Sequence, residues 1–185
     1  MNNVIFLDID GVLNNSIIKF NEESVNVLKE LILRYNAKVV MITSWQLNGT
    51  VNRRKRIELI FEQLGIYDID FIDPNFEGYI FDIKLPDRIL GIIDYLKNND
   101  IDNYVILDDE YYRDYRLVCL NHYRTKTFKG LRYKDLDKVL LKPVNYNNFK
   151  YVNYKYGQLG DYEIVTNNLI KVLRKKYEND INNNI

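Results

Sequence analysis

The 185-residue chain contains a single cysteine, a single histidine and three prolines. One cysteine, Cys119, cannot form an internal disulfide, which excludes a disulfide-stabilised secreted scaffold and predicts an intracellular, cytoplasmic protein. We expect Cys119 to be a small core residue rather than a nucleophile, and we expect the histidine, His122, in a loop or at the surface. Acidic and basic side chains are equal in number, 26 of each, so net charge predicts no general attraction to nucleic acid or membranes.

Long apolar runs are also missing from the chain. No run approaches the roughly 18–20 residues that a membrane span needs. The N-terminus lacks the basic segment and apolar stretch of a signal peptide, and Asp8 interrupts the only early apolar run. We therefore expect no membrane as a partner. The length suits one domain of ordinary size.

Short apolar segments alternate with amphipathic stretches along the chain, which predicts an α/β fold with a parallel sheet. The expected strands are Val4–Leu7, Lys38–Ile42, Tyr104–Leu107 and Leu117–Leu120, with short β-like segments in 66–83. The expected helices are 22–35, Arg53–Leu64, Pro86–Asn98, Tyr133–Leu141 and Glu163–Tyr177. We assign residues 1–141 to the α/β domain. Residues 142–185, whose composition is rich in Asn, Tyr and Lys, form a C-terminal extension that ends in a helix and packs on the same domain.

Polar side chains follow three of the expected strands. Asp8 and Asp10 follow the first, Thr43 and Ser44 the second, and Asp108 and Asp109 the third. In open α/β sheets, ligands bind in the crevice at the carboxyl ends of the strands. Four carboxylates gathered there would repel one another unless a divalent cation joined them, and carboxylate oxygens suit Mg²⁺. The sequence therefore predicts a magnesium site at this edge.

The spacing of the first two aspartates suits phosphoryl transfer. Asp8 could attack a phosphorus while Asp10, two residues on, gives a proton to the leaving group. Gly11 permits a sharp turn that brings backbone N–H groups near a phosphate, and Thr43 offers a hydroxyl donor. The expected cation at the phosphate is Lys84, with Arg88 as the alternative.

These motifs resemble those of the haloacid dehalogenase-like (HAD) hydrolases over about residues 4–140. The resemblance rests on DIDGV (8–12), ITS (42–44), Lys84 before the 86–98 helix, and ILDD (106–109). It implies a Rossmann-like fold with helices on both faces of the sheet. Asp8 would be the nucleophile that forms a phosphoaspartate, and Asp10 the general acid and base. The implied Mg²⁺ ligands are Asp8, Asp109, the backbone carbonyl of Asp10, and Asp108 directly or through water. Thr43 and Lys84 would bind the phosphoryl group, with Gly11, Ser44 and Arg88 as further substrate-binding residues.

A closer resemblance connects the chain to the HAD phosphatase domains of RNA-repair proteins. It rests on FLDIDGVLN (6–14), VVMITSW (39–45) and YVILDDE (104–110). In those relatives an Arg usually follows the Trp, whereas Gln46 stands here, so substrate binding is expected to differ. The segments between the motifs are too short for a large lid. This minimal cap implies an open crevice, which suits bulky substrates and also admits small ones.

The sequence thus predicts a Mg²⁺-dependent phosphomonoesterase that acts on nucleic-acid ends or nucleotides. The alternatives are a phosphatase of small metabolites or of phosphoproteins, and a non-catalytic binding module. Trp45 is either a packing residue or a platform for a base, and the basic run 53–56 is either a solvated helix face or a contact for a phosphate backbone. The stretch FKYVNYKY (149–156) is expected as a loop that grips the domain, with base stacking as its alternative.

Overall fold

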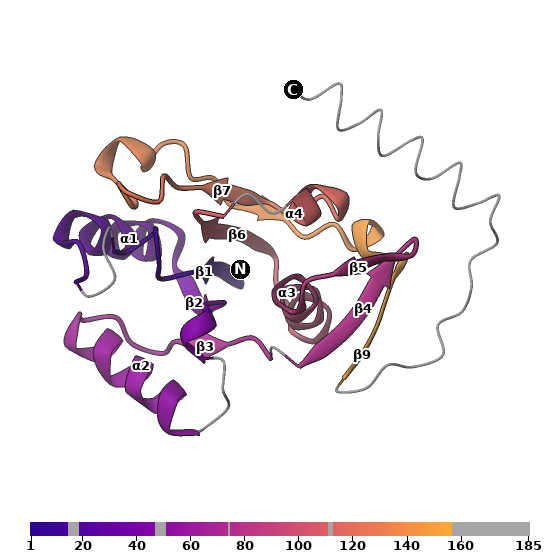
Figure 1. Cartoon of the computed structure of the whole chain (residues 1–185). Coiled ribbons are helices and arrows are strands. Elements are labelled where there is room, and N and C mark those ends of the chain that lie inside the picture. The colour runs from indigo at the N-terminus through magenta and orange to yellow at the C-terminus, as the bar shows by residue number, and fades with distance from the viewer. Residues whose placement is uncertain (15–18, 47–50, 74, 111–112, 157–185) are drawn as a thin grey trace.

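The computed structural model describes residues 1–14, 19–46, 51–73, 75–110 and 113–156. Its centre is a sheet of order β3-β2-β1-β6-β7 in which all neighbours are parallel (Figure 1). The strands are β1 (Asn3–Leu7), β2 (Ala37–Met41), β3 (Asp70–Phe71), β6 (Asn103–Asp108) and β7 (His122–Arg124). A short strand, β8 (Lys142–Pro143), pairs antiparallel with β6. This mainly parallel sheet confirms the predicted α/β, Rossmann-like fold.

The two faces of the sheet bury two separate apolar clusters. Successive side chains of a strand point to opposite faces, so Val4 and Phe6 enter one cluster while Ile5 and Leu7 enter the other. Figure 1 shows α1 and α2 on one side of the sheet and α3 and α4 on the other. The helices are α1 (Glu22–Tyr35), α2 (Val51–Gln63), α3 (Asp87–Asn98) and α4 (Arg113–Leu117). Continuous apolar strands are therefore covered on both faces, as parallel sheets require.

Particular residues at the ends of α1 and α3 fix where these helices begin and end. The Asn21 side chain accepts a hydrogen bond from the Ser24 N–H at the start of α1, and Asn36 ends α1 in a left-handed conformation. Pro86 precedes α3, where its fixed φ suits a helix start and its missing N–H costs nothing. These boundaries place Arg88 in the first turn of α3.

A second, antiparallel sheet of three strands packs on the outer side of α3 (Figure 1). It consists of β4 (Phe76–Ile80), β5 (Ile83–Leu85) and β9 (Val152–Tyr156). The β4–β5 hairpin forms the β-like part of the 66–83 segment, whereas β9 comes from the C-terminal extension, where a loop was expected. That expectation was wrong because Tyr154 packs edge-on against Phe76, with ring centroids 5.4 Å apart, and its hydroxyl donates to Asp94.

Two other predicted elements were also wrong. Leu117 ends α4, and Cys119 lies exposed in a left-handed turn, so Leu117–Leu120 is not a strand and Cys119 is not a core residue. The strand comes later, as β7, and contains His122, which was expected in a loop or at the surface and is half-buried. Tyr133–Leu141 forms only a short 3-10 turn, η2 (Tyr133–Asp135), in place of a helix.

The predicted helix Glu163–Tyr177 lies outside the described residues, so the division into a domain and a C-terminal extension stays a prediction. Residues 142–156 add β8 to the central sheet, the 3-10 helix η3 (Tyr146–Phe149), and β9 to the second sheet. Within the described ranges, no helix is long and apolar enough to cross a membrane.

Candidate active site

Strand register brings the predicted site residues together. Leu7 of β1 is paired with Met41 of β2 on one side and with Leu107 of β6 on the other. Because the three strands are parallel and adjacent, their carboxyl ends meet at one edge of the sheet. The residues that follow, Asp8, Thr43 and the Asp108–Asp109 pair, are therefore neighbours, as the sequence predicted.

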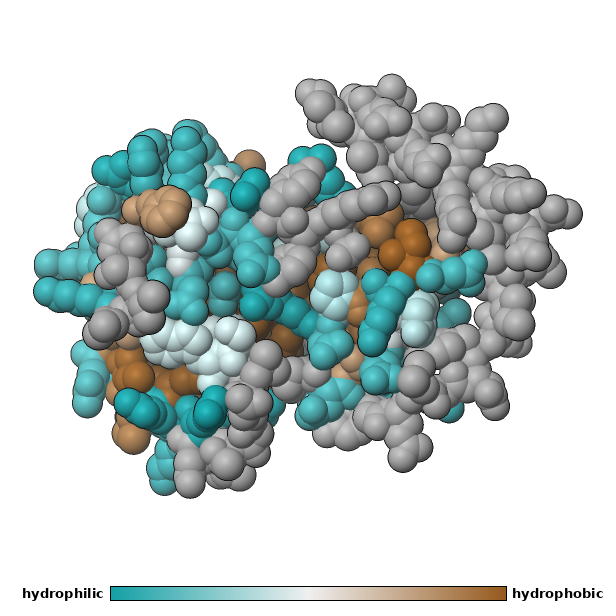
Figure 2. Space-filling model, in the orientation of Figure 1, coloured by the Kyte–Doolittle hydropathy of each residue, from teal (hydrophilic) through white to brown (hydrophobic). Residues whose placement is uncertain are grey.

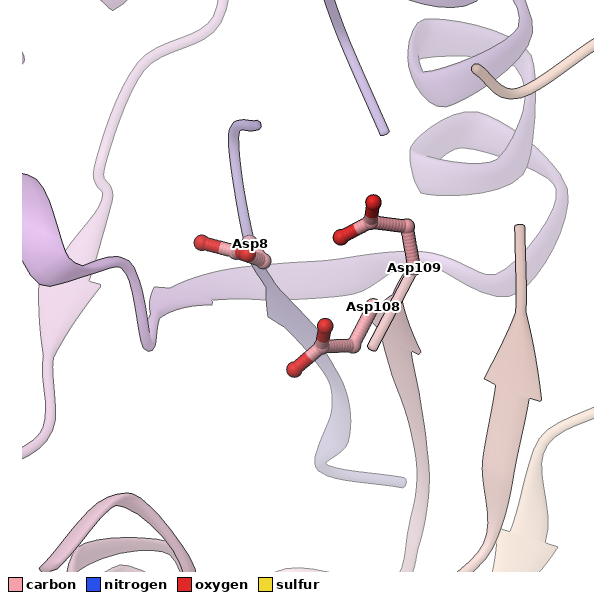
Figure 3. A group of neighbouring side chains, drawn as sticks. All are labelled: Asp8, Asp108 and Asp109. Atoms are coloured by element: carbon pink, nitrogen blue, oxygen red, sulfur yellow. The ribbon is translucent and has the colours of Figure 1, made fainter. Parts of the chain in front are cut away.

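Three carboxylates converge at this edge, from Asp8, Asp108 and Asp109 (Figure 3). One ligand oxygen from each lies within 4.8 Å of the other two. The three residues are 5%, 0% and 8% exposed, respectively. Buried carboxylates at this separation repel one another strongly unless a cation joins them. An all-oxygen donor set of this kind fits a hard divalent ion such as Mg²⁺.

Asp108 is held by three donors. Its Oδ2 accepts from Arg88 Nη1 at 2.7 Å and from the Tyr115 hydroxyl at 2.8 Å, and its Oδ1 accepts from the Glu110 N–H at 2.9 Å. Asp109, in contrast, accepts no hydrogen bond at its carboxylate from any residue that the structure describes. Its carboxylate oxygens are therefore the ones left available for a metal ion.

Arg88 is the cation at the carboxylates. Besides Asp108, its Nη1 lies 3.5 Å from Asp8 Oδ2, and its side chain is only 15% exposed. Burial opposes the charge on Arg88, but Asp8 and Asp108 outweigh this effect and raise its pKa. Lys84 lies exposed on β5, opposite Tyr79 of β4, and forms no ion pair with these aspartates in the described structure. Of the two cations that the sequence offered, Arg88 is therefore the one that lies beside the carboxylates, and the phosphoryl-binding role of either residue stays a prediction.

Burial raises the pKa of Asp8 to about 7. The neighbouring Asp108 charge also raises it, while Arg88, the Ile9 N–H and the Thr43 hydroxyl act in the opposite direction. A positive ion beside Asp8 would favour its ionised form. The carboxylate that is expected to act as nucleophile therefore needs a second cation, in addition to Arg88, to be fully ionised at neutral pH.

Asp10 lies beside this cluster rather than within it. Its side chain is exposed, with Oδ1 accepting from Asn14 Nδ2 and Oδ2 from Trp45 Nε1, each at 2.8 Å. Asn14 also accepts from the Gly11 N–H at 3.0 Å, which ties the turn together. These contacts hold the Asp10 carboxylate in one orientation, as a general acid requires.

Gly11 fits its position for two independent reasons. Its φ of +70° is a conformation that side chains rarely adopt, and a Cβ atom there would overlap the Asp109 carboxylate. Its carbonyl accepts from the Thr125 hydroxyl at 2.8 Å, and the Thr125 N–H donates to the Asp108 carbonyl at 3.0 Å. Thr125, which the sequence did not single out, thus links the turn after β1 to the end of β6.

Thr43 and Ser44, which follow β2, have different surroundings. Thr43 is fully buried, lowers the pKa of Asp8 through its hydroxyl, and accepts a hydrogen bond from the Trp45 N–H at 3.3 Å. Ser44 is exposed and begins a 3-10 turn, η1 (Ser44–Gln46). Trp45 is half-buried and packs near Phe20, with ring centroids 6.3 Å apart. Thr43 is therefore part of the buried cluster, whereas Ser44 and Trp45 lead out of it.

Besides Thr125, three further side chains support the site without having been predicted there. Tyr115 is almost fully buried and donates to Asp108, and the His122 ring packs against it with centroids 4.5 Å apart. Asn14 supports Asp10 from four residues along the chain. The only available signal was the position of Asn14 in the turn after DIDG. Nothing in the sequence connects Tyr115 or His122 to Asp108.

The chain was compared with known protein families, curated proteins and solved structures. Residues 4–136 match the family model described as the HAD domain in Swiss Army Knife RNA repair proteins. No curated protein and no solved structure matches the chain. The match spans β1 to η2 and so includes every residue of the site described above.

Proposed function

Because this chain belongs to the family of HAD domains found in Swiss Army Knife RNA repair proteins, and is thus a hydrolase of the phosphatase type, we propose that it is a Mg²⁺-dependent phosphomonoesterase. Its substrates in this proposal are phosphorylated nucleic-acid ends or nucleotides. The observation that carries the proposal is the buried cluster of Asp8, Asp108 and Asp109 with Arg88 against it. A cytoplasmic location remains part of the proposal.

In the proposed reaction, an Asp8 carboxylate oxygen attacks the phosphorus, and the bond from phosphorus to the ester oxygen breaks. Asp10 gives its proton to that leaving oxygen. Water then attacks the phosphoaspartate while Asp10 takes back a proton, which releases phosphate and regenerates Asp8. Arg88 and the Thr43 hydroxyl bind the phosphoryl oxygens throughout.

The proposed metal ligands are Asp8, Asp109 and the Asp10 backbone carbonyl, with Asp108 assisting. When bound there, Mg²⁺ supplies positive charge that screens the phosphate from the nucleophile. Asp109 fits this role because it is only 8% exposed and its carboxylate accepts no hydrogen bond from the residues that the structure describes. Asp108 is already bound to Arg88 and Tyr115, which suits a supporting role.

The first test is phosphate release from an aryl phosphate by wild type and Asp8→Asn, each with Mg²⁺ and with EDTA. The amide keeps the shape of Asp8 but cannot act as the nucleophile, so we expect activity to fall at least about a thousandfold. Asp137→Asn is the matched control, because Asp137 is 95% exposed and pairs with Arg34 on α1. Equal activity in wild type and Asp8→Asn would contradict the mechanism.

The second test uses 3′- and 5′-phosphorylated oligonucleotides beside a panel of metabolite phosphates. A preference for the metabolites would favour the small-molecule alternative. If all substrates stayed intact with wild type, the non-catalytic binding module would replace the phosphatase. The complete set of carboxylates, hydroxyl and arginine at the site argues against that outcome.

A further inference from the structure

A pocket of about 530 Å³ opens between η1 and α2. It is lined by Ser44, Trp45, Arg53, Arg56, Ile57 and Ile60. The four residues from α2 recur at helical spacing, so one face of the helix forms this wall. In the space-filling view, the surface over α2 carries an apolar patch flanked by strongly hydrophilic side chains (Figure 2). The pocket thus combines an aromatic ring, an aliphatic floor and two exposed arginines.

Trp45 connects the pocket to Asp10, the proposed proton donor. The Trp45 indole N–H donates to Asp10 Oδ2 at 2.8 Å, and the Trp45 backbone N–H donates to Thr43. Asp10 protonates the leaving oxygen in the proposed mechanism, so the leaving group departs on the side of the site where Trp45 lies. A group attached to that oxygen would therefore enter this pocket first.

We propose that this pocket binds the nucleic-acid strand that carries the reacting phosphate. The proposal rests on the proposed phosphatase function and adds how the strand is recognised. The terminal nucleoside contacts Trp45, on which a base can stack whatever its sequence. The next phosphodiester lies against Arg53 and Arg56, because guanidinium groups pair well with phosphate oxygens.

The chemistry of the pocket favours a nucleotide strand over other occupants. A metabolite monophosphate with no other anionic group has nothing to place against Arg53 and Arg56. An acidic peptide could meet the arginines but presents a planar group to Trp45, Ile57 and Ile60 only where it carries an aromatic residue, whereas every nucleotide carries a base. Since the net charge of the chain is zero, this local pair of arginines, rather than a general field, would attract the strand.

Binding can be measured without turnover because Trp45 is the only tryptophan of the chain. Short single-stranded RNA with a terminal phosphate is titrated into the Asp8→Asn protein, and the indole fluorescence is followed. We expect saturable quenching, and an Arg56→Gln change should weaken binding about tenfold, the loss of one charge-assisted contact. The matched control is Lys55→Gln, an equal loss of charge at an exposed residue that does not line the pocket.

The same variants on an otherwise wild-type background separate the two proposals. Arg56→Gln should lower kcat/KM for the RNA about tenfold relative to kcat/KM for an aryl phosphate, and raised salt should reduce this difference. Absence of quenching together with intact hydrolysis, or equal effects of Arg56→Gln and Lys55→Gln, would overturn the pocket assignment. A phosphopeptide that depended on Arg56 more than RNA does would also overturn it. If RNA quenched the fluorescence but wild type hydrolysed no substrate, only the phosphatase proposal would be overturned, and the assignment of the pocket as an RNA-binding site would stand.

Discussion

The neighbouring strands β1 and β6 both lead into two carboxylates, yet the two pairs differ in how the protein treats them. After β1, Asp8 is buried and Asp10 is exposed. At the end of β6, Asp108 and Asp109 are both buried. In each pair, one carboxylate accepts several hydrogen bonds from the protein. Asp10 accepts from Trp45 and Asn14. Asp108 accepts from Arg88, Tyr115 and the Glu110 N–H.

The difference shows how four identical side chains can take distinct roles. Protein donors fix the orientation of Asp10 and Asp108, which suits a proton donor and a supporting ligand. Asp8 is only weakly paired, with Arg88 Nη1 at 3.5 Å, and its pKa is raised to about 7. Asp109 accepts no hydrogen bond at its carboxylate within the described ranges. These two carboxylates, one after each strand, are therefore available to bind an external ion or a substrate.

Comparing Asp10→Asn with Asp109→Asn is expected to give the largest effects, and it tests whether the two carboxylates have separate roles as proton donor and metal ligand. Asp10→Asn should lower kcat by about 10²–10⁴-fold, the usual contribution of a general acid, while leaving the Mg²⁺ requirement near that of wild type. Asp109→Asn should raise the Mg²⁺ concentration for half-maximal activity by about 100-fold. Losing a residue that only supports a metal ligand weakens metal binding by about 10–100-fold, and losing a direct ligand should cost at least the upper value. Magnesium titrations of aryl phosphate hydrolysis check both. Equal shifts in the two titrations would contradict the separate roles.

Arg88 and Lys84 offer a comparison of stability. Arg88→Gln would leave Asp8 and Asp108 facing each other without their cation, so we expect the free energy of unfolding to fall by about 3 kcal/mol in EDTA. Lys84→Gln should change it by less than about 0.5 kcal/mol, as exposed positions usually do. Urea unfolding measures both, and added Mg²⁺ should return part of the loss in Arg88→Gln. A larger loss of unfolding free energy in Lys84→Gln than in Arg88→Gln would contradict the assignment of Arg88 as the cation that pairs with these carboxylates.

The choice between Lys84 and Arg88 shows where sequence reasoning reached its limit. The apolar runs predicted β1, β2 and β6, and strand order then placed Asp8, Thr43 and Asp108 together. Which cation faces them depends on where β5 ends and α3 begins. Lys84 belongs to a hairpin strand and Arg88 to the first helical turn. Pro86 marks this boundary in the sequence, but which of the two side chains faces the carboxylates also depends on how α3 and the hairpin pack together.

Long-range pairing explains why β9 was predicted as a loop. The strand β9 carries alternating Tyr, Asn and Lys rather than an apolar run, and it exists because it pairs with β4, far away in the sequence. At Gly78 of β4, a Cβ atom would lie 2.5 Å from the Asn153 carbonyl oxygen, so the close approach of the two strands depends on this glycine. No periodic pattern within the 152–156 segment predicts its pairing with β4. The Tyr115–Asp108 contact is local, seven residues apart, and was missed because the short helix α4 that carries Tyr115 was not predicted.

The titration of Asp8 gives the next prediction, for the metal-free protein. Burial raises its pKa from 3.8 to about 7 on folding, so the folded protein binds the extra proton between these values. The stability due to this proton is fully present below pH 3.8 and is lost as pH rises through 7. In EDTA we expect a loss on the order of 2 kcal/mol across this range, less than the shift of Asp8 alone would give, because Arg88 and Asp108 lie beside it and interact with its charge. Urea unfolding of wild type and Asp8→Asn at several pH values checks this, because the amide removes the slope. An unchanged slope in Asp8→Asn would assign it to another group.

Gly11 and Gly65 separate the strain of a left-handed backbone from the steric demand of the site. Their φ values are +70° and +73°, but a Cβ at Gly65 would meet only Lys29 Nζ at 3.5 Å, an ordinary contact. Each Ala substitution should therefore cost about 1–2 kcal/mol of backbone strain. Gly11→Ala should cost roughly 1–2 kcal/mol more, because the methyl group must displace Asp109, and it alone should raise the Mg²⁺ requirement. Denaturant unfolding and a magnesium titration of both variants give the difference directly. Equal costs with an unchanged Mg²⁺ requirement would mean that Asp109 moves aside freely, so that its carboxylate is not held against the turn after β1.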